Sequence, residues 1–75
     1  ALAADAHAAG VRDAAALERI AVEEITAEPA ARLEYLAVVD PETLLPLGRV
    51  EGRGLMVTAV WFGEIRLIDN QLLPG

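Results

Sequence analysis

The sequence contains no cysteine, no lysine and no serine, and it holds one residue each of methionine, phenylalanine, tyrosine and tryptophan. The absence of cysteine excludes disulfides, thiolate zinc sites and cysteine nucleophiles. The absence of serine removes serine-based catalytic triads, and three scattered threonines are the only other aliphatic hydroxyls. No apolar run approaches the roughly 20 residues of a membrane span, and the first residues do not form a secretory signal. These features predict a soluble, cytoplasmic protein.

Negative charge dominates, because six arginines stand against twelve acidic residues and give a formal net charge of −6. Nucleic acids and anionic lipid surfaces would repel such a chain, since binding them depends on cationic side chains that release counterions. We therefore expect neither a nucleic acid nor a membrane among its partners.

The length of 75 residues predicts one small domain over residues 1–75. A domain of this size buries only roughly 60% of the surface that its unfolded chain exposes, so its stability margin is thin. Hydrophobic residues make up 55% of the chain. They suffice for a core, which aliphatic side chains and alanine must mostly fill.

Alanine-rich sequence over residues 1–31 predicts two helices. Residues 1–9 resemble the end of a helix that begins upstream, and Gly10 suits the left-handed position after a helix end. Asp13 is the expected N-cap of the second helix, which Pro29 closes. The apolar stripe of that helix consists of Leu17, Ile20, Ala21 and Ile25.

The apolar period changes to two after Pro29 and predicts three strands. Asp40 begins a turn and a long irregular connection, and Gly63-Glu64 suits a type II′ hairpin turn with glycine first. The tail, residues 71–75, is expected to fray. The expected strands are residues 32–39, 55–62 and 65–70. The fold class is therefore α+β, with two helices packed on a three-stranded, mostly antiparallel sheet.

Strict alternation makes both faces of this sheet apolar. The first face holds Leu33, Tyr35, Ala37, Val39, Leu55, Val57, Ala59 and Trp61, and the second holds Leu36, Val38, Met56, Val60 and Phe62. An antiparallel sheet covered on one side only should be polar on its other side. We therefore expect the second face to pack against something outside these residues, either further chain or a second copy through self-association.

His7 is the only histidine and the first candidate for chemistry. A general base needs a partner and a substrate cleft, but alanines flank this residue, which favours a solvent-facing or helix-end histidine. A metal site is also disfavoured, because Asp5 lies two positions away and cannot share its helix face.

Asp40 and Asp69 stand near the ends of predicted strands and could form a carboxylate pair for acid–base catalysis. The favoured alternative is structural: Asp40 caps the turn before Pro41, and Asp69 with Asn70 fixes the end of the last strand.

The remaining candidates also have simpler explanations. Three glycines, Gly48, Gly52 and Gly54, lack the strand-to-helix context of a phosphate-binding loop. Arg66 could bind an anion, but an ion pair with an acidic residue across the sheet is favoured. The residues alone therefore assign no catalytic, cofactor-binding or metal-binding residue.

Two stretches carry a resemblance to a known family. Residues 33–44, LEYLAVVDPETL, resemble the YLEVVDPETL strand and turn of pantothenate synthetases, the pantoate–β-alanine ligases. Residues 59–70, AVWFGEIRLIDN, resemble the final hairpin of the same family, AVxxGxTRLIDN, with Ile65 where the family commonly has threonine. The resemblance in sequence covers Leu33–Asn70, whereas the alanine-rich helices resemble the family only in being helices.

The resemblance implies a lid-like C-terminal domain whose upstream, nucleotide-binding catalytic domain is absent from this sequence. The full-length family condenses pantoate with β-alanine through a pantoyl adenylate, with ATP and magnesium, releasing pyrophosphate and AMP. Its HxGH and MSSRN motifs do not occur here, so none of its catalytic or ATP-binding residues maps onto this chain. We expect this part alone to be inactive and to bind neither ATP nor magnesium.

Two alternatives remain open. One is a free-standing interaction module that dimerises through the apolar sheet face. The other is a small stand-alone enzyme that uses Asp40 and Asp69.

Overall fold

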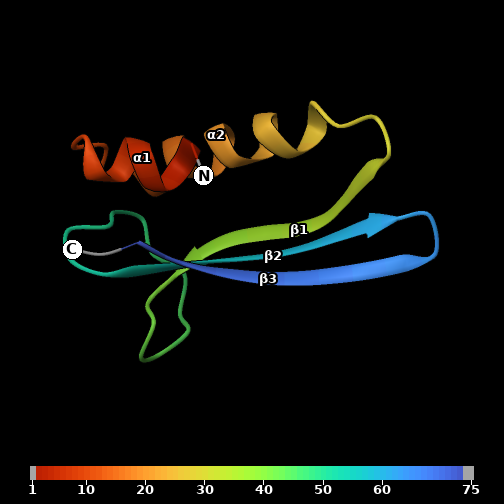
Figure 1. Cartoon of the computed structure of the whole chain (residues 1–75). Coiled ribbons are helices and arrows are strands. Elements are labelled where there is room, and N and C mark those ends of the chain that lie inside the picture. Colours follow the sequence, from red (N-terminus) through yellow and green to blue (C-terminus); the bar gives the residue numbers. More distant parts are fainter. Residues whose placement is uncertain (1, 74–75) are drawn as a thin grey trace.

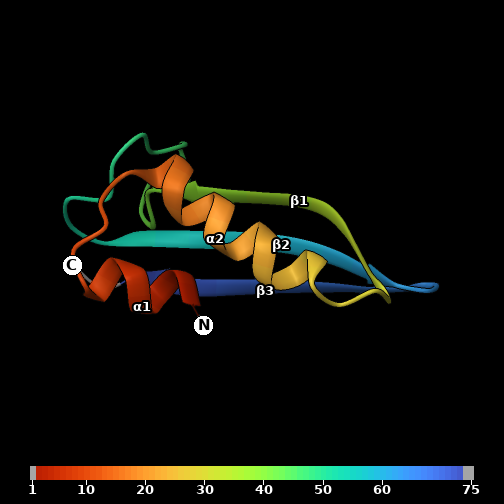
Figure 2. The same cartoon turned by 90° about the horizontal axis from the view of Figure 1, so that it is seen from above.

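The computed structural model describes residues 2–73 as one layer of helices lying on one face of a sheet (Figures 1 and 2). Neither helix within this range is long and apolar enough to cross a membrane. The elements are α1 (Leu2–Ala8), α2 (Ala14–Thr26), β1 (Ala31–Val39), β2 (Gly54–Phe62) and β3 (Ile65–Leu73). The predicted α+β class is confirmed.

The helix ends form where the sequence predicts them. Gly10 has a φ of 116°, and the amides of Gly10 and Val11 donate to the carbonyls of His7 and Ala6, as in a Schellman C-cap. Asp13 then caps α2, because its side chain accepts a hydrogen bond of 3.1 Å from the amide of Ala16. These local signals turn the chain back on itself and set α1 against α2.

The sheet has the order β1-β2-β3, and both strand pairs are antiparallel. Gly63 has a φ of 63° at the β2–β3 turn. Among the described residues the only non-glycine with positive φ is Leu44, so Glu64 is not left-handed and the turn fits type II′ rather than type I′. The predicted fraying from residue 71 is wrong for Gln71–Leu73, because they pair with β2 and Leu73 is fully buried. Residues 74 and 75 lie outside the described part.

A bulge in β1 breaks the predicted alternation. Leu33 pairs with Val60 and Tyr35 pairs with Ala59, which leaves Glu34 as the extra residue. Directly paired residues share a face, so Leu33 lies on the same face as Val60, and Tyr35 lies on the opposite one. The prediction that Leu33 and Tyr35 share a face is therefore wrong.

The helices cover the face that was expected to stay open to a partner. Val38, Met56 and Leu73 form the core with Leu17 and Ala21 of α2. Because both faces of the sheet are apolar, alternation alone could not show which one the helices choose. The second face is therefore mostly covered within this chain. The uncovered face instead exposes Tyr35, Ile68 and Leu72.

The connection between β1 and β2 packs against the helices at Val50. The Val50 amide donates to the Arg12 carbonyl over 2.8 Å, and the Val50 side chain is fully buried. Gly54, at the start of β2, lies so close that an added Cβ would stand 2.8 Å from a Val50 methyl carbon. A glycine is therefore required by packing at this position.

We expect Gly54→Ala to lower the free energy of unfolding by about 1–3 kcal/mol, because the stiff, buried Val50 side chain cannot move aside. Urea denaturation would measure the change. Gly52→Ala is the matched control, since a Cβ there meets nothing within 4 Å. Equal effects of the two substitutions would contradict this interpretation of the contact.

Candidate functional site

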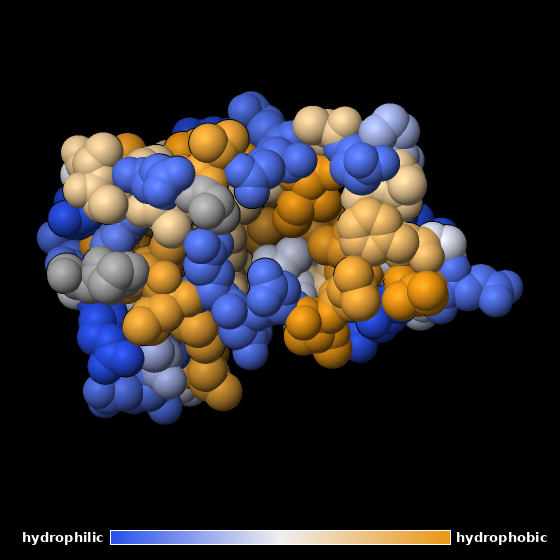
Figure 3. All heavy atoms as spheres, viewed as in Figure 1, coloured by the Kyte–Doolittle hydropathy of each residue, from blue (hydrophilic) through white to orange (hydrophobic). Residues whose placement is uncertain are grey.

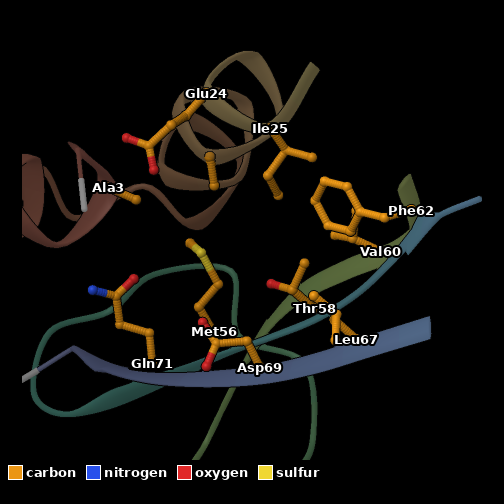
Figure 4. A pocket seen from close by; sticks show the side chains of 11 residues that line it. Ala3, Glu24, Ile25, Met56, Thr58, Val60, Phe62, Leu67, Asp69 and Gln71 are labelled. Carbon is orange, nitrogen blue, oxygen red and sulfur yellow. The ribbon is translucent and has the colours of Figure 1, made fainter. Parts of the chain in front are cut away.

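A cleft with a volume of about 230 Å³ lies between the two helices on one side and strands β2 and β3 on the other (Figure 4). Most of its wall is apolar, and four polar side chains join it. The helices contribute Ala3, Ala21, Glu24 and Ile25, and the sheet contributes Met56, Thr58, Val60, Phe62, Leu67, Asp69 and Gln71. The cleft is smaller than the roughly 300 Å³ at which pockets for drug-sized ligands begin. It therefore suits a few side chains better than a whole organic substrate.

The charged groups of the cleft are two carboxylates on opposite walls, Glu24 of α2 and Asp69 of β3. The Glu24 carboxylate accepts a hydrogen bond of 3.1 Å from the Leu2 amide. None of the residues that line the cleft is an arginine. The cleft therefore favours an apolar group that carries positive charge at its edge.

The opposite face of the sheet carries a polar network around Glu34. Arg66 donates to both Glu34 carboxylate oxygens, at 3.1 Å through Nε and 2.6 Å through Nη2, and Trp61 Nε1 donates to Oε1 at 2.7 Å. The Arg32 guanidinium carbon lies 5.7 Å from the Trp61 ring centroid. These contacts tie all three strands together.

The predicted ion pair of Arg66 across the sheet is thus confirmed. Hydrogen bonds from Arg66 and Trp61 hold the pKa of Glu34 below its ordinary value. Glu34 as the partner of Arg66 was not predicted from the sequence. The apolar spacing of Leu33, Tyr35 and Leu36, which breaks strict alternation, is the signal that could have placed a bulge there.

Asp40 and Asp69 do not form a carboxylate pair. Asp40 accepts hydrogen bonds from the Glu42 and Thr43 amides at 2.8 and 3.1 Å, which confirms its predicted turn-capping role and lowers its pKa. Asp69 pairs in register with Thr58, whose partner on β1 is Leu36, four residues before Asp40. The two aspartates are therefore separated by about 13 Å along the strands in addition to the spacing between strands.

The expected role of Asp69 at a strand end is wrong. It lies in the middle of β3, because that strand continues to Leu73, and its side chain lines the cleft.

His7 lies at the end of α1, as one prediction had it, but it is not solvent-facing. Its side chain is 1% exposed, and its Nε2 lies 3.2 Å from the Val50 carbonyl oxygen. Since that oxygen can only accept, Nε2 carries the proton in this contact. The helix pattern missed this burial because the loop that covers His7 comes from 43 residues further along the chain. The role of His7 is to join α1 to that loop.

The glycine-rich segment holds no phosphate-binding turn. Gly48 and Gly52 lie in the connection between strands, and Gly54 begins β2 rather than a helix. Within residues 2–73, no three His, Asp or Glu side chains come together as metal ligands.

Comparisons with known proteins decide the family. The family model described as pantoate-beta-alanine ligase matches residues 1–72. The chain belongs to the pantoate–β-alanine ligase family. The pantothenate synthetase of Moorella thermoacetica is 47% identical over 72 residues, which are 96% of this chain and 25% of that protein. That of Rubrobacter xylanophilus is 53% identical over 66 residues, 87% of this chain and 23% of that protein.

The structure also resembles a solved ligase of this family. The crystal structure of pantothenate synthetase from Thermus thermophilus superposes with a TM-score of 0.86 at 36% sequence identity. The match covers 97% of this chain and 26% of the Thermus chain. This chain therefore spans about a quarter of the length of the ligases that it resembles, and the resemblance extends through the helices as well as the sheet.

The Glu34 network should make stability depend on pH. Because the pKa of Glu34 is lowered in the folded state, its carboxylate stabilises the fold at pH values above the ordinary carboxyl pKa. This contribution is lost as the pH falls through the lowered pKa. We expect Glu34→Gln to lower the urea midpoint at pH 7, and we expect this difference to shrink as the pH falls below the ordinary carboxyl pKa. A difference whose size does not change with pH would contradict the role of the charge.

Proposed function

We propose that this chain is the lid-like C-terminal domain of a pantoate–β-alanine ligase, over residues 1–75. The whole ligase would use ATP to form a pantoyl adenylate and pyrophosphate from pantoate. The amine of β-alanine would then displace AMP and form pantothenate. The observation that carries the proposal is the match of nearly the whole chain to one quarter of the known synthetases, in sequence and in fold.

The chemistry would reside in the rest of the ligase. ATP and magnesium would bind the upstream nucleotide-binding domain; within residues 2–73 no three His, Asp or Glu side chains come together as metal ligands. Two of the side chains that the sequence offered for chemistry, Asp40 and Arg66, are engaged in a turn and an ion pair. This domain would then contribute surface rather than reactive groups, and the whole ligase would act in the cytoplasm.

A lid has a clear physical task in such a reaction. The acyl adenylate is a mixed anhydride, and water competes with the amine for its carbonyl carbon. Closing a domain over the intermediate excludes water until the amine attacks. A domain with uncovered apolar surface suits this task, because that surface is stabilised by contact with the catalytic domain.

A second candidate is a free-standing module that dimerises. It is favoured by one observation, the exposed side chains of Tyr35, Ile68 and Leu72 on the face away from the helices. Sedimentation distinguishes the ligase domain from the dimerising module. If the chain sediments as a dimer and Ile68→Gln makes it a monomer, self-association through this face is supported.

We expect the pure chain to release no AMP from ATP, pantoate and β-alanine. A Moorella synthetase from which the quarter that matches this chain has been deleted should also release little AMP. Adding this chain to it as a separate polypeptide should restore AMP release at least partly. A coupled assay for AMP would measure both results. If the chain alone released AMP, and if Asp40→Asn or Asp69→Asn abolished that release, the proposal would be contradicted and a stand-alone enzyme would be favoured.

A further inference from the structure

The two edges of the sheet are built differently. β1 carries the bulge at Glu34, and the connection that follows it folds back along its end. There the Leu47 amide donates to the Val38 carbonyl over 3.0 Å, and Pro46 forms a bridge with Val39. The nine residues of β3 pair with β2 without a shift in register and include no proline. Proteins commonly blunt an edge strand with bulges, prolines or covering segments. β3 has none of these devices, so it forms the open edge of the sheet.

The free backbone groups of β3 belong to its even-numbered residues. In a two-residue hairpin turn the flanking pair, here Phe62 and Ile65, is hydrogen-bonded. Hydrogen-bonded and non-hydrogen-bonded pairs then alternate along an antiparallel ladder, so the odd-numbered residues of β3 direct their amides and carbonyls to β2. The groups that face away from β2 belong to Arg66, Ile68, Asn70 and Leu72. Within residues 2–73 no backbone hydrogen bond from a turn, loop or cap reaches these four.

Exposed apolar side chains gather along the same strand. They are Ile65, Leu67, Ile68 and Leu72, at 64%, 52%, 59% and 44% exposure. Figure 3 shows hydrophobic side chains toward the hairpin end of the molecule. The four lie on both faces of the sheet, because odd and even residues of a strand alternate. A neighbour on one face would leave half of them exposed, whereas a further strand beside β3 would contact both faces and satisfy the free backbone groups.

The chemistry of β3 is symmetric about Asn70. Residues 67–73 read LIDNQLL, with a polar residue and then two apolar residues on either side of the asparagine. Two antiparallel copies related by a two-fold axis at Asn70 set equivalent positions opposite each other. Apolar pairs across strands stabilise a sheet, and like charges directly opposite destabilise it. The symmetry therefore favours a second copy of this chain as the partner of β3.

We propose that two copies of this chain join edge to edge through β3, so that their two three-stranded sheets form one continuous antiparallel sheet. The predicted pairs are Leu67 with Leu73, Ile68 with Leu72, Asp69 with Gln71, and Asn70 with its own counterpart. Residues with free backbone groups then meet one another, and the amides and carbonyls of Ile68, Asn70 and Leu72 find partners in the second copy.

Other registers are less favourable. An axis at Asp69 would bring two carboxylates directly opposite each other. An axis at Ile68 would set each Asp69 opposite the apolar Leu67. The axis at Asn70 avoids both, because it sets each Asp69 opposite Gln71, whose side-chain amide is a hydrogen-bond donor. The proposal goes beyond the proposed function, since it concerns how the domain meets a second copy and assigns it no chemistry.

Proline at position 70 tests the edge directly. Because the Asn70 amide faces away from β2, Asn70→Pro removes a donor of the free edge and leaves the ladder between β2 and β3 intact. Asn70→Thr keeps the amide and is the matched control. In sedimentation equilibrium we expect a dimer whose dissociation constant rises at least about tenfold in Asn70→Pro, because each copy loses a hydrogen bond. The dissociation constant of Asn70→Thr should stay close to that of the unchanged chain.

A substitution on β1 separates edge pairing from dimerisation through the outer face. Ile68→Gln would weaken both kinds of dimer. Tyr35 lies on the outer face at the opposite edge of the sheet, so Tyr35→Gln should preserve an edge-paired dimer. A dimer that Tyr35→Gln dissociates and Asn70→Pro retains would overturn the proposal. A chain that stays monomeric at millimolar concentration would also overturn it.

Amide hydrogen exchange tests the pairing even if Asn70→Pro does not fold. The unchanged chain would be compared by NMR below and above the dissociation constant of the dimer. The amides of Ile68, Asn70 and Leu72 should gain roughly tenfold protection or more in the dimer. The Gln71 amide should gain less, because it already faces β2. Exchange of the three edge amides that does not depend on concentration would contradict the pairing. None of these readouts involves AMP release, so a failure of the proposed function is distinguishable from a failure of this inference.

Discussion

The junction at Val50 holds the two layers of this domain together. Its carbonyl accepts from the buried ring of His7, its amide donates to Arg12, and its side chain presses on Gly54 at the start of β2. A long connection without regular structure thus becomes part of the core. Because a small domain has little core, a contact that joins α1, the turn before α2 and the sheet at one point carries a large share of its order.

Packing is uneven along the domain. The core from Leu17 to Leu73 lies beneath the helices, while the hairpin end around Phe62 and Leu67 extends past them. The outer face is held by the Glu34 network rather than by packing. This division between a buried core and exposed apolar surfaces supports the proposal that the chain is one domain of a larger ligase.

Local signals in the sequence predicted the local structure well. Gly10, Asp13 and Gly63 each act on their own few residues, so their roles as C-cap, N-cap and turn residue could be read directly. Asp40 is similar, because its hydrogen-bond partners follow it at once. The family resemblance from the RLIDN hairpin also depended on contiguous residues.

Contacts between segments that are distant in the chain could not be predicted from the sequence. The burial of His7 depends on a loop 43 positions away, and the bulge at Glu34 depends on Arg66 of a strand 32 positions away. The choice of sheet face was equally hidden, because two apolar faces give the same alternation. The cleft, with Asp69 inside it, exists only because of that choice.

Hydroxyl-radical footprinting of Phe62 and Leu67 tests the central claim most directly, that the rest of a ligase completes this surface. The chain alone would be compared with the same chain joined to the remaining three quarters of the Moorella synthetase. The account predicts that both side chains react readily in the chain alone and lose most of their reactivity in the whole enzyme. Equal reactivity in an active whole enzyme would contradict it.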